Sequence, residues 1–234
     1  MMQTPRADSA EPVEAFIFDM DGTMINSMPW HAKSWVEFTH RHGLELDLPD
    51  LMRRTTGRNG AECIRELFQR DMDDAQAWAL IHEKEVIYRE MFAPQFSEVA
   101  GFTAFSERAR SRGLKVGVGT AGDRHNIEFV LSHLKLPTHP LALVGGDEGL
   151  PGKPEPAIFL EAARQMKTGA GACIVFEDAP FGIEAARRAG MRAVAICTGH
   201  SAAELAGPHV LAAVRDYNEL FESNFLESLH VASA

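Results

Sequence analysis

The chain has 234 residues, of which 45% are hydrophobic, enough for one large globular domain or for a domain with a modest insertion. Its formal net charge at pH 7 is −10 without any basic block, which argues against a general nucleic-acid-binding protein. No apolar run approaches the roughly 20 residues of a membrane span, and the N-terminal residues lack the apolar segment of a signal peptide. We expect a cytoplasmic monomer that binds neither nucleic acid nor membranes.

Five short apolar runs follow a polar segment, residues 1–14, that we interpret as a disordered tail. Each run ends in small or acidic residues, and helical patterns separate the later ones. This alternation favours an α/β fold, a Rossmann-like parallel sheet with helices on both faces. The predicted strands are 15–18, 114–119, 141–146, 172–178 and 192–197, and the predicted helices between them are 123–134, 154–166 and 181–189.

Residues 29–97 break this alternation because no strand is evident in them. Pro29 is placed where a helix begins, and the apolar residues after it recur at helical spacing. We interpret this segment as an all-helical cap inserted into the α/β catalytic core, which then consists of residues 1–28 and 98–234. The faces that we expect to be apolar carry Met28, Ala32, Trp35 and Val36 in one helix, Ile64, Leu67 and Phe68 in a second, and Trp78, Ile81, Tyr88 and Phe92 in a third, with Glu85 as a polar exception.

The sequence FIFDMDGT, residues 16–23, places two carboxylates one residue apart at the end of an apolar strand. Alternate residues of a strand point the same way, so Asp19 and Asp21 emerge together at its carboxyl end, where open α/β sheets bind ligands. Two carboxylates about 4 Å apart repel each other by roughly 4 kcal/mol at an effective dielectric constant near 20. The pair therefore needs a bound cation, or one of its members must take a proton.

A second acidic pair, Glu177 and Asp178, ends the apolar run of residues 172–178. If the two strands are neighbours, three or four carboxylates line one cleft. Hard oxygen ligands of this kind suit Mg²⁺, which usually retains several water molecules and binds a substrate phosphate. We predict a Mg²⁺ site formed by Asp19, Asp21, Glu177 and Asp178.

Two further polar residues occupy comparable places, since Thr120 ends the second run and Lys153 lies just before a helix. A hydroxyl and an ammonium beside a magnesium site are what a transferring phosphoryl group requires. Asp19 can accept the phosphoryl group as a nucleophile and form an acyl phosphate. Asp21 can protonate the leaving oxygen and then deprotonate water.

At four positions the chain resembles the motifs of the haloacid dehalogenase superfamily, in the same order. These are DMDGT at residues 19–23, then Thr120, then Lys153, and then FEDAPFGIEAARRAGM at residues 176–191, with spacings of 101, 33 and 25 residues from Asp19 to Asp178. The resemblance spans about residues 15–200 of the chain. An insertion directly after the first motif is similar to the helical cap of the β-phosphoglucomutase-like branch.

The resemblance implies a role for each matching residue. Asp19 would be the nucleophile and a metal ligand, and Asp21 would be the acid/base, with its backbone carbonyl also on the metal. Thr120 and Lys153 would hold the phosphoryl group, and Asp178 would be the third protein ligand, with the preceding glutamate beside it. Dehalogenases of the superfamily lack the second acid of the first motif, so Asp21 favours phosphate esters as substrates.

The chain departs from the family pattern in two places. Family phosphatases often follow the second-motif hydroxyl with Asn or Ser, whereas Ala121 and Gly122 follow it here, so we expect the Ala121 backbone amide to help bind the phosphate. Mutases carry an Arg three residues after a Gly in the cap, to clamp a second phosphate. Here Gly60 stands three residues after Gly57, and Thr56 stands where mutases have a Lys. We therefore favour a phosphatase over a mutase.

Two cap residues are candidate substrate contacts. His31 lies near the first cap helix, where mutases have a His that gates the cap, and a solvent-facing helical His is the alternative interpretation. Arg58 is either substrate-facing or an ordinary surface charge. The expected partner is a small phosphorylated metabolite, with a sugar phosphate as the family-level expectation.

Residues 117–122, GVGTAG, match a dinucleotide-binding loop, and Asp147 follows the next strand, where such a fold places its ribose acid. An NAD-binding oxidoreductase is therefore a rival from a different class. It leaves both acidic pairs and Lys153 unexplained, so we favour the phosphatase. A non-catalytic binding protein on the same scaffold is a third class, and the intact set of charged residues argues against it.

Overall fold

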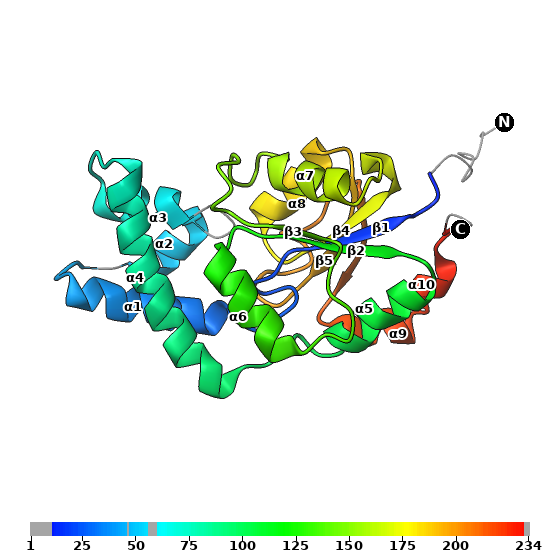
Figure 1. The fold of residues 1–234 in the computed structure, drawn as a ribbon, viewed down its shortest axis with the longest axis horizontal. Helices are drawn as coiled ribbons and strands as arrows, with labels where there is room; N and C mark the ends of the chain where they lie inside the picture. Colours follow the sequence, from blue (N-terminus) through cyan, green and yellow to red (C-terminus); the bar gives the residue numbers. More distant parts are fainter. Residues whose placement is uncertain (1–10, 46, 56–59, 232–234) are drawn as a thin grey trace.

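The computed structural model describes residues 11–45, 47–55 and 60–231. In this part of the chain six strands form a single parallel sheet in the order β3-β2-β1-β4-β5-β6, which crosses the middle of Figure 1. Five of the strands are those that the sequence predicts, and β6 is additional. The strands are β1 (Ala15–Phe18), β2 (Lys115–Gly119), β3 (Ala142–Val144), β4 (Cys173–Glu177), β5 (Arg192–Ile196) and β6 (Val210–Val214).

Helices cover both faces of this sheet (Figure 1). The helices of the core are α5 (Phe102–Ser111), α6 (Arg124–Leu134), α7 (Ala157–Gln165), α8 (Pro180–Arg188), α9 (Tyr217–Glu222) and α10 (Phe225–Ser228), with a short 3₁₀ turn, η2 (Ala170–Ala172); a second 3₁₀ turn, η1 (Ala93–Gln95), precedes them in the segment between β1 and α5. Phe16 and Phe18 of β1 pack with α5, α6 and α9, whereas Ala15 and Ile17 pack with α7 and α8. Alternate residues of one strand thus bury in two opposite layers, and the predicted α/β fold is confirmed.

The segment between β1 and α5 folds into helices that extend to one side of the sheet (Figure 1). Within the described residues these are α1 (Met28–Arg41), α2 (Leu48–Thr55), α3 (Gly60–Phe68) and α4 (Asp74–Phe92). They pack around an apolar cluster of their own, which includes Trp35, Phe38, Ile64 and Ile81. These helices are the inserted cap that the sequence predicts.

One residue of a predicted cap face, Val36, is misplaced. Val36 is 50% exposed, whereas Phe38 and Thr39 are buried together with Trp35. Helical spacing alone is compatible with either position at the edge of the apolar face, because Trp35 and Val36 are about 100° apart around the helix and an apolar face is at least about that wide. The cap packs against the face that Trp35 and Phe38 share, so Val36 is turned toward solvent.

Two helix starts orient the residues near the strand ends. Ser27 precedes α1, and Pro29 lies in the first turn, where its missing N–H removes no helical hydrogen bond. The Asp123 carboxylate accepts the Asn126 backbone N–H at 2.8 Å and so caps the N-terminus of α6. Helix α6 therefore begins a few residues after β2 and presents its first turn to the cap.

The predicted tail is wrong at its end, since Val13 is buried and forms a β-bridge with Val231. Residues 1–10 lie outside the described residues. None of the helices in the described ranges combines the length and apolar character that crossing a bilayer requires. The domain boundaries near residues 28 and 97 stay predictions.

Candidate active site

Neighbouring strand ends bring four of the predicted residues together. Because β1 pairs with β2 on one side and with β4 on the other, the residues that follow these strands meet at one edge of the sheet. Asp19 follows β1, Thr120 follows β2, and Glu177 and Asp178 stand at the end of β4. All four side chains are buried.

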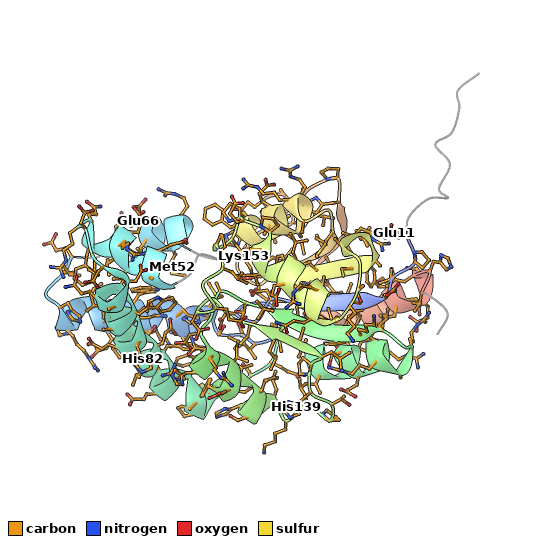
Figure 2. All side chains as sticks on the ribbon, turned by 45° about the horizontal axis from the view of Figure 1, so that its top comes forward. Glu11, Met52, Glu66, His82, His139 and Lys153 are labelled. Carbon is orange, nitrogen blue, oxygen red and sulfur yellow. The ribbon has the colours of Figure 1, made fainter. Side chains whose placement is uncertain are left out.

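Lys153 forms the ion pairs of this cluster. Its Nζ donates to Asp19 Oδ1 at 2.5 Å and to Glu177 Oε2 at 2.8 Å. Figure 2 shows Lys153 on the side of the core that faces the cap helices carrying Met52 and Glu66. Burial alone would lower the pKa of Lys153, but the two carboxylates outweigh burial and raise it, so the ammonium stays charged.

The cluster carries more negative charge than one ammonium neutralises. Burial and the neighbouring Glu177 raise the pKa of Asp178 and of Asp19, although Lys153 opposes both shifts. Buried carboxylates without enough positive charge around them are costly. A cation bound among these side chains would remove that cost.

The geometry of the cluster fits a divalent metal ion. Asp19, Glu177 and Asp178 each offer a carboxylate oxygen, and these oxygens lie within 4.8 Å of one another. Among the residues that the structure describes, Asp178 Oδ2 is buried without a hydrogen-bond partner. A Cβ at Gly22 would lie 2.2 Å from that oxygen, so the glycine keeps the space beside it open. A free, buried carboxylate oxygen next to open space is suited to Mg²⁺.

Glu177 differs from Asp178 because both of its oxygens already accept hydrogen bonds. Oε2 accepts from Lys153, and Oε1 accepts the Ala179 backbone N–H at 3.1 Å. Gly182 lies so close that a Cβ there would stand 2.0 Å from Glu177 Cδ. This glutamate is therefore fixed in place and holds Lys153, and its predicted role beside a metal stays a prediction.

Thr120 and the loop after it face the same pocket. Thr120 Oγ1 accepts the Gly122 backbone N–H at 3.0 Å, which leaves its hydroxyl hydrogen available to a phosphoryl oxygen. Ala121 lines the pocket beside it. Asp147, the proposed ribose acid of the dinucleotide alternative, accepts the Arg124 backbone N–H at 3.2 Å and is not among the residues that line this pocket.

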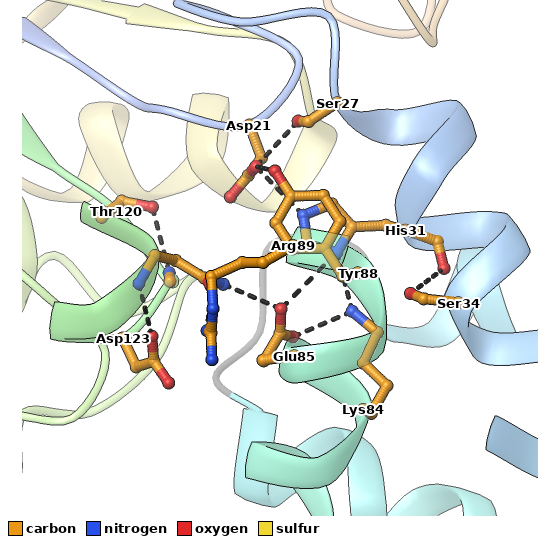
Figure 3. A network of polar contacts seen from close by, with 12 residues as sticks. Asp21, Ser27, His31, Ser34, Lys84, Glu85, Tyr88, Arg89, Thr120 and Asp123 are labelled. Carbon is orange, nitrogen blue, oxygen red and sulfur yellow. Dashed lines mark hydrogen bonds and ion pairs between the residues drawn. The ribbon is translucent and has the colours of Figure 1, made fainter. Parts of the chain in front are cut away.

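The Asp21 carboxylate is turned toward the start of the cap. Its Oδ1 accepts hydrogen bonds from Ser27 Oγ at 2.7 Å and Tyr88 OH at 3.3 Å, and it lies 3.0 Å from His31 Nε2 (Figure 3). Burial alone would raise the pKa of Asp21, but His31 and Ser27 lower it below its ordinary value. In this arrangement Asp21 is an ionised carboxylate.

His31 is held between the acid/base candidate and the cap. Its ring stacks on Tyr88 with the ring centroids 3.8 Å apart, and its Nδ1 lies 2.7 Å from Lys84 Nζ. Lys84 in turn donates to Glu85 Oε1 at 2.8 Å. The His31 ring is not solvent-facing, since it makes these contacts, and its role in gating the cap stays a prediction.

Several of these contacts could not be predicted from the sequence. Ser27 is an ordinary helix-start residue, and Tyr88 was placed on an apolar helix face without a partner for its hydroxyl. Lys84 stands next to the polar exception Glu85, and that adjacency is the one signal that could have indicated a buried ion pair. Lys84 is 53 residues from its partner His31 in the chain, and Tyr88 is 67 residues from its partner Asp21.

A pocket between core and cap joins these groups. Its core side carries the acidic cluster and Thr120, and its cap side adds an apolar wall of Trp35, Met52, Cys63, Trp78 and Ile81. Gly60 also lines it, at the position where the resemblance places an Arg in mutases. Arg58, Gly57 and Thr56 lie outside the described residues, so the contact predicted for Arg58 stays a prediction.

The fold and the site define a capped α/β hydrolase whose acidic site lies at the carboxyl ends of the central strands. The family model for haloacid dehalogenase-like hydrolases matches residues 13–190. The chain belongs to this family, and β-phosphoglucomutases are among its relatives, as the four motifs indicate. Membership of a hydrolase family favours the hydrolase over the NAD-binding alternative.

Individual relatives share most of their length with this chain. Fructose-1-phosphate phosphatase YqaB of Escherichia coli (strain K12) is 35% identical over 186 residues, which cover 79% of this chain and 96% of that protein. Validoxylamine A 7'-phosphate phosphatase of Streptomyces hygroscopicus subsp. limoneus is 31% identical over 211 residues, covering 87% and 94% respectively. The crystal structure of a hydrolase from Pseudomonas syringae is similar with a TM-score of 0.81 at 27% identity, covering 93% of this chain and 100% of that one.

Proposed function

We propose that this protein is a Mg²⁺-dependent phosphatase that hydrolyses a small phosphomonoester through an aspartyl-phosphate at Asp19. The observation that carries the proposal is the buried cluster in which Lys153 contacts both Asp19 and Glu177, next to Asp178. A carboxylate nucleophile, a fixed ammonium and a carboxylate suited to a metal, at one point under a cap, are the parts that phosphoryl transfer needs.

In the first half of the reaction an Asp19 oxygen attacks phosphorus, and the bond from phosphorus to the leaving oxygen breaks. Lys153 and the Thr120 hydroxyl hold the phosphoryl oxygens and stabilise their charge. Asp21 takes up a proton from solvent when the anionic substrate binds beside it, and gives this proton to the leaving oxygen, which departs as an alcohol. An anionic phosphate close to Asp21 favours the protonated acid, and so opposes the effect of His31 on this carboxyl.

In the second half water attacks the phosphorus of the aspartyl-phosphate. Asp21, left as a carboxylate by the first half, takes the proton of this water, and the bond from phosphorus to Asp19 breaks. Inorganic phosphate leaves, and both aspartates return to their starting forms. The hydrogen bonds from Ser27 and His31 favour the ionised Asp21 that this half needs.

A Mg²⁺ ion held by Asp19, the Asp21 backbone carbonyl and Asp178, with Glu177 beside it, would neutralise the excess negative charge and polarise the phosphoryl group. The chain itself keeps these oxygens in place. Gly22 leaves room beside Asp178, and the fixed Glu177 keeps Lys153 on the nucleophile.

A sugar phosphate is the proposed substrate class. The name of the Escherichia coli relative gives fructose 1-phosphate as the compound on which that protein acts, which supports this class. The pocket offers a sugar an apolar wall on the cap side and polar groups on the core side. We further propose that the core comprises residues 1–28 and 98–234 and the cap residues 29–97, and that the protein is a cytoplasmic monomer.

A β-phosphoglucomutase-type mutase is the second candidate, because β-phosphoglucomutases are among the relatives. Gly60 supports the phosphatase, since a glycine offers no charge to clamp the second phosphate that a mutase must hold. A mutase would return the phosphoryl group to a sugar, whereas a phosphatase transfers it to water.

A screen of phosphorylated metabolites with Mg²⁺ tests the function. We expect phosphate release from at least one sugar monophosphate. The same screen measures glucose 6-phosphate formed from β-glucose 1-phosphate, and that product without phosphate release would favour the mutase. Neither activity with any compound would contradict both candidates.

Trapping the intermediate tests the nucleophile. Wild-type protein quenched in acid during turnover of a radiolabelled substrate should carry a label that hydroxylamine removes, as an acyl phosphate does. Asp19→Asn should lose both the label and turnover while its thermal unfolding still shows a folded protein. Turnover retained by this variant would contradict the mechanism.

A further inference from the structure

Asn126 of the core helix α6 is clamped by two residues of the cap helix α4. Its Nδ2 donates to Glu85 Oε2 at 2.8 Å, and its Oδ1 accepts from Arg89 Nη1 at 2.7 Å. Glu85 and Arg89 are four residues apart, so they lie on the same side of α4. Asn126 is buried, and both ends of its amide are used across the boundary between core and cap.

Glu85 begins a chain of contacts that ends at Asp21 (Figure 3). Its other oxygen accepts from Lys84 at 2.8 Å, and Lys84 Nζ lies 2.7 Å from His31 Nδ1. An ammonium can only donate, so His31 Nδ1 accepts and His31 Nε2 carries the hydrogen that is donated to Asp21. Every hydrogen bond from Asn126 to Asp21 thus has a defined donor and acceptor.

The chain depends on its first member because its charges are buried. Lys84 is 1% exposed and forms an ion pair with the Glu85 carboxylate. The Glu85 carboxylate needs hydrogen-bond donors on both oxygens, and Asn126 is the donor that comes from the core. Without Asn126, the core would no longer fix the orientation of Glu85, and Lys84 and His31 would lose the support that Glu85 gives them.

We propose that Asn126 and Glu85 are positioning residues that orient the acid/base Asp21, through Lys84 and His31, when the cap is docked on the core. The inference rests on the phosphatase function proposed above. It makes proton transfer at Asp21 dependent on the hydrogen bond between Asn126 of the core and Glu85 of the cap.

The test compares two phases of p-nitrophenyl phosphate hydrolysis with Mg²⁺. The nitrophenolate leaving group needs no proton, so its release reports attack by Asp19, whereas steady-state turnover also needs Asp21 to take a proton from water. Asn126→Ala and Glu85→Ala should keep a burst of about one nitrophenolate per active site. Their steady-state kcat should fall at least about tenfold, with KM within about twofold.

His82→Ala is the matched control, because His82 of α4 contacts His125 of α6 at the same boundary, with ring centroids 5.3 Å apart. Both of these histidines are exposed, and neither belongs to the chain from Asn126 to Asp21. This control should keep kcat within about twofold of wild type. Glu85→Gln, which retains one acceptor oxygen, should give a kcat between those of wild type and Glu85→Ala.

The outcomes separate the inference from the proposed function. If wild type releases no phosphate from any ester with Mg²⁺, the proposed function fails. If wild type is active, three outcomes would overturn the inference. Asn126→Ala and Glu85→Ala could keep the wild-type kcat, or they could lose the burst and the steady-state turnover together while still folded. In the third outcome, the kcat of His82→Ala falls as much as theirs. Should Asn126→Ala not fold, Asn126→Asp keeps the acceptor for Arg89 but removes the donor to Glu85, and it should show the same retained burst and reduced turnover.

Discussion

Asp21 receives its hydrogen bonds on a single carboxylate oxygen, Oδ1, from Ser27, His31 and Tyr88. These donors come from the loop after β1, from α1 and from α4, so they fix the orientation of the carboxylate only when the core and the cap lie together. Two of these donors, His31 and Ser27, favour the charged form of Asp21 against the effect of burial. The hydrogen bonds to Asp21 Oδ1 therefore both orient the carboxylate and keep it in the ionised form that can accept a proton.

Asp21→Asn should lower kcat on a sugar monophosphate by about 10²–10⁴-fold, the usual contribution of a general acid/base. The amide has nearly the size of the carboxyl group but can neither give nor take the proton. Steady-state kinetics measure the change, and thermal unfolding checks that the variant is folded. A kcat comparable to that of wild type would remove the acid/base role from Asp21.

A second prediction for a single residue concerns Gly22, which lies beside the Asp178 carboxylate. Its φ of +78° disfavours any other residue, and a Cβ would stand 2.2 Å from Asp178 Oδ2. Gly22→Ala should lower the free energy of unfolding by more than the about 1–2 kcal/mol expected of a left-handed conformation alone. It should also lower phosphatase activity at least about tenfold, because Asp178 must move.

Gly43→Ala is the control, since Gly43 has a φ of +63° but nothing within 4 Å of the added Cβ. It should show the conformational cost, measured by urea unfolding, and keep the activity. Equal activity in the two variants would mean that the space beside Asp178 has no function.

The elements of the core could be read from the sequence more completely than those of the cap. β1 and β4 are buried throughout, so each is a continuous apolar run that ends at an acid. β6 could not be predicted in the same way. It is an edge strand with alternating partly buried and exposed residues, and its short segment, Val210–Val214, has no acid or glycine directly after it.

In the cap, helical spacing predicted the helices and most of their buried residues correctly, but it misplaced the edge of one apolar face. Val36 was assigned to an apolar face and is exposed, because tertiary packing selects between adjacent positions. Helix α4 carries Lys84 and Glu85 side by side, both buried, since it packs against the other cap helices and against α6 of the core. A sequence pattern with one apolar face does not predict a helix buried in this way.

Because Glu85 is buried and paired in α4, we expect its contribution to the free energy of unfolding to fall at low pH. Burial alone would raise the pKa of Glu85, but Lys84, followed by His31, lowers it below its usual value. Asp123, the N-cap of α6, interacts with it electrostatically, and Arg89 of the next turn of α4 binds the Asn126 that donates to Glu85. A lowered pKa in the folded protein means that the stabilisation is present above the pKa of unfolded glutamate, about 4.3, and is lost as the pH falls further.

Urea unfolding of wild type and Glu85→Gln measures this effect. The free-energy difference in favour of wild type should be largest above about pH 5 and should shrink as the pH falls below about 4.3. Glu90→Gln, the same substitution at an exposed position of the same helix, should show little pH-dependent difference. A constant difference for Glu85→Gln across this range would contradict the role of its charge.

At the scale of the whole molecule, the sequence predicts the core half of the candidate active site better than it predicts the cap half. The core half consists of residues at the ends of neighbouring parallel strands, so motif order and topology together predict that Asp19, Thr120 and Asp178 meet. The cap half depends on pairs such as Asn126 and Glu85, which are 41 residues apart and carry no pattern that links them. The sequence therefore predicts the chemistry better than it predicts how the cap controls it.

The excess negative charge of the acidic cluster should make the stability of the whole protein depend on Mg²⁺. An ion that binds the folded chain and not the unfolded chain stabilises it by about 2.7 kcal/mol at 100 times its dissociation constant, or very roughly 5–10 °C in Tm for a chain of this size. Thermal unfolding in Mg²⁺ and in EDTA at equal ionic strength measures this difference. Asp178→Asn should remove the rise in Tm, because the amide lacks the charge of the free oxygen beside Gly22. A rise of the same size in Asp178→Asn, or no rise in wild type, would mean that these carboxylates do not bind the ion.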